Sequence, residues 1–192
     1  MATDFAFRKK AMKELPTSTG VYVLCDLDEV PIYVGQSKDG IRSRVSRHLT
    51  SARSDIIANR QIDVWEIAYV WAYPIADVKD ITPTENRLYH HFNKKSKLMN
   101  GTVPPEPPKA PVPKAAVKVQ VMSDKEIAER KTPEQRLPRQ ANHYAQIVGH
   151  FLAVKNSTQI AGAMDAHFQR LSKYHSLLIK SAVSYSDESA ES

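Results

Sequence analysis

Two short motifs that combine tyrosine with glycine lie near the start of the chain. The first is Gly20-Val21-Tyr22 and the second is Tyr33-Val34-Gly35. β-branched and aromatic residues surround both motifs and a short polar segment separates them, so the pattern predicts a β-hairpin. A tyrosine hydroxyl can orient or deprotonate an attacking water when its pKa is lowered or a metal lies nearby. The alternative for each ring, taken alone, is ordinary packing across the hairpin.

An arginine and a histidine follow at helical spacing. Apolar residues recur every three or four positions over residues 41–53, which predicts a helix. Arg44 and His48 are one turn apart and project side by side from its edge. A guanidinium can bind two phosphate oxygens as a fork, and the imidazole can relay a proton or contact phosphate. The glycine before the helix leaves Arg42 as a competitor for the phosphate role, but helix geometry favours Arg44.

Glu85 is the candidate metal ligand. It lies at the start of a predicted helix that runs from Thr82-Pro83 to about Lys97. A single carboxylate that holds hydrated Mg²⁺ or Mn²⁺ would clamp a phosphate oxygen and polarise a water. The alternative is structural, because Thr82-Pro83-Thr84-Glu85 fits a capping box with proline in the first turn.

Basic residues gather on both sides of these candidates. The default interpretation of such a cluster is a solvated helix face, but a groove that follows a phosphate backbone has the same composition. No base-reading motif accompanies them, so no sequence specificity is inferred. The basic candidates for nucleic-acid binding are Lys38, Arg42, Arg47, Arg53, Arg87, Lys94, Lys95 and Lys97.

Taken together, these positions resemble the GIY-YIG nuclease family. That family's motifs imply an arginine on the helix after the second motif, a histidine or tyrosine four residues later, a glutamate on a later helix and an asparagine near the end of the domain. Arg44, His48, Glu85 and Asn100 stand in those places, in that order. Valine replaces the isoleucines of the family name, which keeps a β-branched strand residue. The resemblance covers about residues 18–101.

The resemblance implies a metal-dependent endonuclease that hydrolyses phosphodiester bonds of DNA. The catalytic candidates are Tyr22, Tyr33, Arg44, His48 and Glu85, with Glu85 as the ligand of Mg²⁺ or Mn²⁺. Asn100 joins the basic residues as a nucleic-acid-binding candidate. The general base stays open between the two tyrosines and the histidine. The alternative function is a non-catalytic nucleic-acid-binding or assembly protein that retains the fold.

The predicted fold class is α+β, with a helical part after a proline-rich break. Residues 1–101 are expected to form a GIY-YIG-like domain with a mixed three-stranded sheet, its third strand at 64–73. Six of the 12 prolines fall between Pro104 and Pro113, so 102–123 are predicted to be a linker. Apolar stripes predict an α-helical hairpin within 124–182. The acidic, serine-rich residues 183–192 are predicted to be a disordered tail.

Composition narrows the class of protein further. The 192 residues carry a net charge of +6, which suits an anionic partner, and one cysteine, which excludes a disulfide framework or a cysteine-rich zinc site. No apolar run is long enough to span a membrane, and the first residues do not form a secretory signal. The sequence therefore predicts a cytoplasmic protein without a membrane contact. Two helices alone bury little apolar surface, so the C-terminal helices are also predicted to form a homodimer contact.

Overall fold

The central element of the chain is a four-stranded antiparallel sheet in the order β2-β1-β3-β4. The computed structural model describes residues 4–51, 54–58, 60–154 and 157–190, with the backbone only for residues 55, 58, 159 and 183–190. The predicted α+β class is confirmed, whereas the mixed three-stranded sheet is corrected to an antiparallel one with a fourth strand. The strands are β1 (Gly20–Cys25), β2 (Pro31–Ser37), β3 (Tyr69–Pro74) and β4 (Val117–Gln120).

The fourth strand comes from the segment that the sequence predicts to be a linker. After Pro113 the chain has no proline until Pro133, and valines alternate with polar residues at 117–121. This alternation suits an edge strand, and Val119 pairs with Val70 of β3 and is buried. The prediction of a linker over 102–123 is therefore wrong for residues 117–123.

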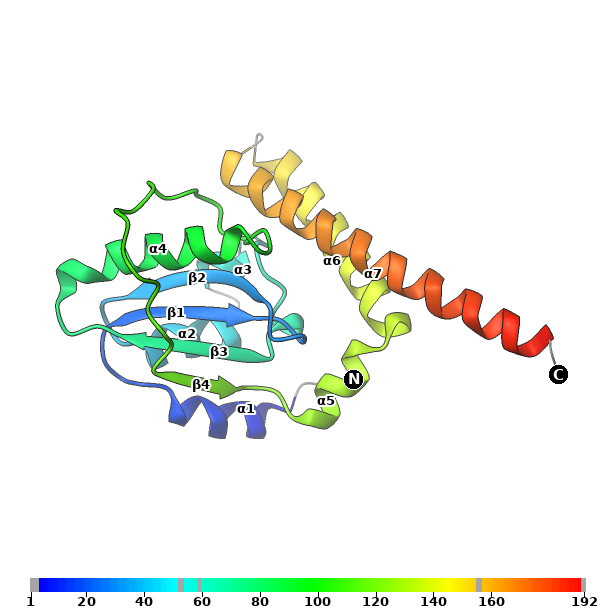
Figure 1. Ribbon diagram of the computed structural model, residues 1–192, viewed down its shortest axis with the longest axis horizontal. Coiled ribbons are helices and arrows are strands. Elements are labelled where there is room, and N and C mark those ends of the chain that lie inside the picture. Colours follow the sequence, from blue (N-terminus) through cyan, green and yellow to red (C-terminus); the bar gives the residue numbers. More distant parts are fainter. Residues whose placement is uncertain (1–3, 52–53, 59, 155–156, 191–192) are drawn as a thin grey trace.

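Helices cover both faces of the sheet (Figure 1). Because β1 alternates its side chains between two buried faces, Tyr22 points to one layer and Val21 to the other. The layer around Tyr22 includes α1 (Phe5–Ala11) and α2 (Ile41–Thr50), and the layer around Val21 includes α4 (Ile81–Asn93). Short helical segments connect these elements: η1 (Met12–Glu14), α3 (Asp55–Ala58), η2 (Val64–Glu66) and η3 (Val78–Asp80).

The strand predicted over 64–73 is correct only in its second half. Residues 64–66 form η2 instead, because the Asp63 side chain accepts a hydrogen bond of 3.1 Å from the backbone N–H of Trp65 and caps that turn. The strand begins at Tyr69. A local cap has therefore overridden the alternating pattern of aromatic residues.

Residues 102–116, named the strap here, lead from the end of the α4 layer into β4 (Figure 1). The imidazole Nε2 of His90 on α4 lies 2.8 Å from the carbonyl oxygen of Pro104. At the other end the backbone N–H of Ala116 donates to the carbonyl of Ala72, 3.0 Å away. The proline-rich segment is therefore held against the domain at both ends.

Three helices follow β4: α5 (Asp124–Lys131), α6 (Pro133–Ala153) and α7 (Thr158–Ala190). α6 and α7 pack along each other, as expected for a helical hairpin. The predicted tail at 183–192 is corrected, because α7 continues to Ala190 and residues 191–192 lie outside the described part. No proline or glycine follows Gly162, so nothing in the sequence stops that helix. Over the described residues, no helix combines the length and the apolar character needed to cross a membrane.

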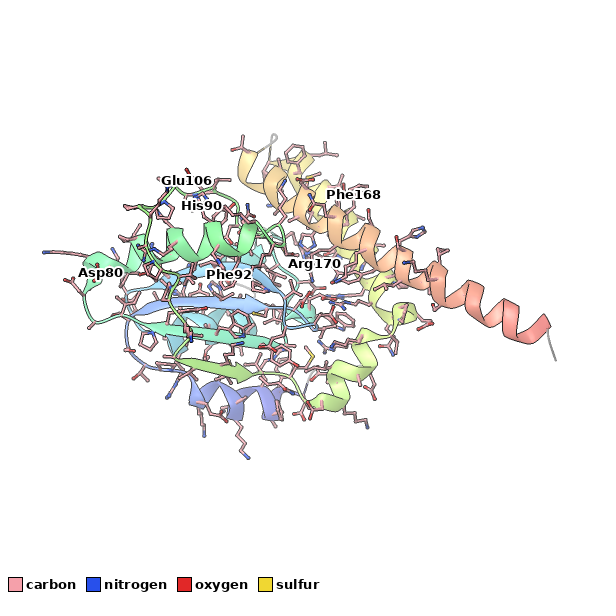
Figure 2. All side chains as sticks on the ribbon, in the orientation of Figure 1. Asp80, His90, Phe92, Glu106, Phe168 and Arg170 are labelled. Carbon is pink, nitrogen blue, oxygen red and sulfur yellow. The ribbon has the colours of Figure 1, made fainter. Side chains whose placement is uncertain are left out.

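A network of buried charges joins the C-terminal helices to the sheet. Arg136 on α6 donates from Nη2 to Glu66 (2.9 Å) and from Nη1 to Asp28 (2.6 Å). Arg170 on α7 pairs with Asp26, which is fully buried, and Figure 2 shows Arg170 where α7 approaches the sheet. Removing either arginine would leave a buried carboxylate without its partner. The helices thus dock on the sheet of their own chain, and self-association through them stays a prediction.

Candidate active site

The two motif tyrosines lie on neighbouring strands and share one face of the sheet. Tyr22 pairs with Gly35 in the β1–β2 register and Leu24 pairs with Tyr33, so the two rings are two positions apart on the same side. Their ring centroids are 6.3 Å apart. A Cβ atom built on Gly35 would lie 2.5 Å from the Tyr22 hydroxyl oxygen. The glycine of the second motif therefore leaves the space that this hydroxyl occupies.

His48 connects the first tyrosine to a serine. Its Nε2 lies 2.6 Å from the Tyr22 hydroxyl oxygen, and its Nδ1 lies 2.6 Å from Oγ of Ser54. Tyr22, His48 and Ser54 are all buried, with at most 1% of each residue exposed. Such a chain of three polar groups holds the imidazole in one orientation. Sequence reasoning missed Ser54, because one serine after a helix carries no pattern of its own.

The two competing arginines of α2 have different surroundings. Nε of Arg42 donates a hydrogen bond of 2.8 Å to the carbonyl oxygen of Leu15, which fastens α2 to the segment before β1. Arg44 lies one helical turn before His48 and is half-buried. The Arg42 side chain therefore has a structural role, and Arg44 stays the candidate for phosphate binding.

Glu85 lines a cavity of about 520 Å³ next to the start of the strap. The same cavity is lined by Tyr33, Asn86, Tyr89 and Asn100. Tyr33 thus belongs to two groups, because its ring also lies 6.4 Å from that of His48, centroid to centroid. Among the described residues, the lining of this cavity does not include Arg44.

The structure removes the capping alternative for Glu85. The helix α4 begins at Ile81 rather than at Pro83, its N-cap is Asp80, and no side chain there makes a cap hydrogen bond. The hydroxyl of Thr82 instead lies 3.3 Å from Oε1 of Gln36 on β2. The carboxylate of Glu85 is therefore left facing the cavity and has no ion pair or hydrogen bond within the described part of the chain.

The donor chemistry of this cavity fits one hard divalent cation with most of its waters retained. Among the described residues, no group of three or more histidines, cysteines or carboxylates could hold a metal. A lone carboxylate in a roomy cavity with both polar and apolar walls suits Mg²⁺ or Mn²⁺, which bind through oxygen and keep water ligands. Burial raises the pKa of Glu85 to about 7, so the ionised carboxylate is costly until a cation neutralises it. Glu85 would hold this ion.

We expect the Glu85→Gln variant to differ from the wild-type protein in the pH dependence of stability. The native pKa of Glu85 is raised above its unfolded value of about 4.3, so the wild-type protein loses stability as pH rises from about 4 to about 7. The glutamine variant does not carry that loss. In urea unfolding with EDTA present, the unfolding free energy of the variant minus that of the wild-type protein should therefore be larger at pH 8 than at pH 5. A difference in unfolding free energy that is independent of pH would contradict the burial of this carboxylate.

The basic candidates are spread over both layers. Lys38 and Arg47 are exposed near α2, Arg87 is half-buried on α4, and Arg53 lies outside the described residues. Lys94 and Lys95 are exposed just after α4, and Lys97 pairs with Asp165 of α7. The two groups therefore flank the sheet from opposite sides.

Asn100 has a structural task. Its Oδ1 accepts a hydrogen bond of 3.0 Å from the backbone N–H of Val34, and its Nδ2 donates one of 2.7 Å to the Val34 carbonyl. The side chain thus pairs with β2 as a neighbouring strand would. Both the oxygen and the nitrogen of the side-chain amide are used in this way, so Asn100 positions the wall of the cavity beside Tyr33.

In comparison with known proteins, the chain matches no family model, no curated protein and no solved structure. The resemblance to the GIY-YIG nucleases therefore rests on the motif positions themselves.

Proposed function

We propose that this chain is a metal-dependent endonuclease that hydrolyses phosphodiester bonds of DNA. One observation carries the proposal: a buried Tyr22–His48–Ser54 chain lies beside Tyr33, and Tyr33 lines a cavity with the carboxylate of Glu85, which has no ion pair or hydrogen bond among the described residues. Phosphodiester hydrolysis needs an oriented water, groups that bind phosphate oxygens and help for the leaving alkoxide. These five residues and Arg44 are of the types that supply such groups.

We assign the proton transfers to Tyr22, Tyr33 and His48. In the tautomer with its proton on Nδ1, His48 donates to Ser54 and accepts from the Tyr22 hydroxyl at Nε2. The imidazole can then take up a proton that passes through Tyr22. Tyr33 is half-buried and lines the cavity, so its hydroxyl is the one that orients the attacking water.

We assign the stabilisation of the charge on the phosphate to Arg44 and Glu85. The guanidinium of Arg44 binds two phosphate oxygens and stabilises the charge that builds up on them. Glu85 holds the divalent cation through its carboxylate, and Asn86, Tyr89 and Asn100 shape the cavity around it. When bound, this cation supplies a Lewis acid for a phosphate oxygen and an acidified water.

Plasmid nicking tests the proposal directly. Full-length protein incubated with supercoiled plasmid should produce open circles with Mg²⁺ or Mn²⁺ and none with EDTA. DNA that is bound but never cleaved, by well-folded protein over pH 6–9 and with either metal, would favour the non-catalytic alternative instead.

We expect Ser54→Ala to slow cleavage by about tenfold, as a positioning effect on His48. Loss of the Nδ1 contact frees the imidazole to adopt the other tautomer, in which Nε2 no longer accepts from Tyr22. The acidic limb of the pH–rate profile should move, and Ser54→Thr, which keeps the hydroxyl, should restore both rate and profile. A lower rate with an unchanged pH profile in Ser54→Ala would indicate a packing role alone.

A further inference from the structure

A groove of about 400 Å³ lies between the residues that follow α4 and the side of α7. Residues 93–97 form one wall, and α7 residues from Ala166 to Lys173 form the other. The two walls are about 70 residues apart in sequence, so the groove exists only because the C-terminal helices dock on the sheet. Five basic side chains line it: Lys94, Lys95, Lys97, Arg170 and Lys173.

Positive charge in this groove is only partly compensated. Three carboxylates pair with its cations: Asp165 with Lys97, and both Asp26 and Glu66 with Arg170. Lys94, Lys95 and Lys173 have no ion pair among the described residues. Like charges held together without counter-charges create a field that favours an anion.

The neighbouring His91 responds to the same field. Burial is the largest cause of its lowered pKa, and the charges of Lys95 and Lys94 lower that pKa further. Lys94 and Lys95 therefore disfavour a further positive charge nearby, such as protonated His91, and favour a negative one.

Arg170 places a largely buried guanidinium at the α7 wall of this groove. The residue is only 7% exposed, and its Nη2 is engaged with Asp26 and with the Tyr174 hydroxyl, 2.7 Å away. Its Nε is buried and makes no hydrogen bond within the described chain. The Arg170 guanidinium adds to the positive charge that lines the α7 side of the groove. Figure 2 shows the position of Arg170 between α7 and the sheet.

We propose that this groove binds a backbone phosphate of the DNA substrate, so that α7 forms part of the nucleic-acid surface. The inference rests on the proposed function, which supplies the DNA. Asn93, which lines the groove, lies eight residues after Glu85 on a neighbouring side of α4 and about 12 Å along the helix, or roughly 3–4 base pairs of duplex. A duplex at the Glu85 cavity would therefore place a phosphate near the groove.

The test measures binding without cleavage. Full-length protein in EDTA is titrated into a fluorescently labelled 20-base-pair duplex, and anisotropy gives Kd over a series of salt concentrations. The variant is Lys94→Gln with Lys173→Gln, and the matched control is Lys9→Gln with Lys10→Gln, which removes the same charge from the exposed side of α1. We expect about a tenfold weaker Kd and a salt slope reduced by about two in the variant only, for any duplex sequence.

Three outcomes would overturn the assignment, and they are distinguishable. If wild-type protein nicks plasmid but the two double variants bind duplex equally, the groove is wrong and the proposed function stands. If wild-type protein binds no duplex, both proposals fail. If titration with inorganic phosphate shows a site that Lys173→Gln removes while duplex affinity is unchanged, the groove takes small phosphates and not DNA. Equal thermal midpoints for variant and control exclude misfolding as the cause.

Discussion

Glu85→Gln in the full-length protein should reduce Mg²⁺-dependent nicking about a thousandfold and leave the fold intact. The glutamine amide has nearly the same shape but is a poor ligand for a hard dication. Losing the cation removes several kcal/mol of transition-state stabilisation, and each factor of ten corresponds to about 1.4 kcal/mol. No cap is lost with the carboxylate, because Asp80 is the N-cap of α4.

The matched control is Glu134→Gln, which removes the same charge from an exposed position in the first turn of α6. It should nick plasmid at the wild-type rate. Calorimetric titration with Mg²⁺ adds a readout that does not depend on cleavage: wild-type protein should bind the ion and the Glu85→Gln variant should not. Cleavage at the wild-type rate by a folded Glu85→Gln protein would contradict the assignment of Glu85 as the metal ligand.

Arg44→Lys should cost about a hundredfold in cleavage rate although it keeps the charge. A lysine ammonium is a point charge and cannot bind two phosphate oxygens in the planar fork that a guanidinium makes. Loss of one such donor from a transition-state site is typically worth two to three orders of magnitude. Single-turnover rates at saturating enzyme measure this step apart from DNA binding.

Two neighbours on α2 serve as controls for that substitution. Arg47→Lys, on the exposed side of the helix, keeps the charge of a nucleic-acid-binding candidate, so the single-turnover rate at saturating enzyme should stay unchanged. Arg42→Lys should weaken the contact with the Leu15 carbonyl and lower stability by about 1 kcal/mol, with little effect on cleavage. Equal rate losses in Arg42→Lys and Arg44→Lys would show that the phosphate arginine has been assigned to the wrong helix position.

Local patterns in the sequence were sufficient to predict the hairpin that carries Tyr22 and Tyr33 and the helix that carries Arg44 and His48. Each of these elements depends on near neighbours in the chain: β-branched runs next to a turn, and apolar residues at helical spacing. The close pairing of His48 with Tyr22 follows once these two elements pack against each other. The α+β class follows from the same elements.

Where a local sequence pattern was misleading, a competing local interaction decided the structure. The Thr82-to-Glu85 pattern offers a capping box as the alternative role of Glu85, but α4 begins at Ile81, whose side chain is fully buried against the sheet. Residues 64–66 alternate like a strand, yet the cap from Asp63 turns them into η2. In both cases several local structures are close in energy, and burial or a single hydrogen bond selects one of them.

Contacts between distant residues were beyond what the sequence could determine. Arg170 meets Asp26 across 144 positions, and Asn100 meets Val34 across 66. Ser54 reaches His48 only because the chain turns back after α2. The sequence by itself determined the hairpin, the helices α2, α4, α6 and α7 in outline, and the residue types of the candidate site, whereas α1 and α5 were not predicted. The tertiary structure alone decided that a strand from the proline-rich segment completes the sheet and that α7 meets Lys94 across a groove, because these contacts depend on which distant surfaces bury together.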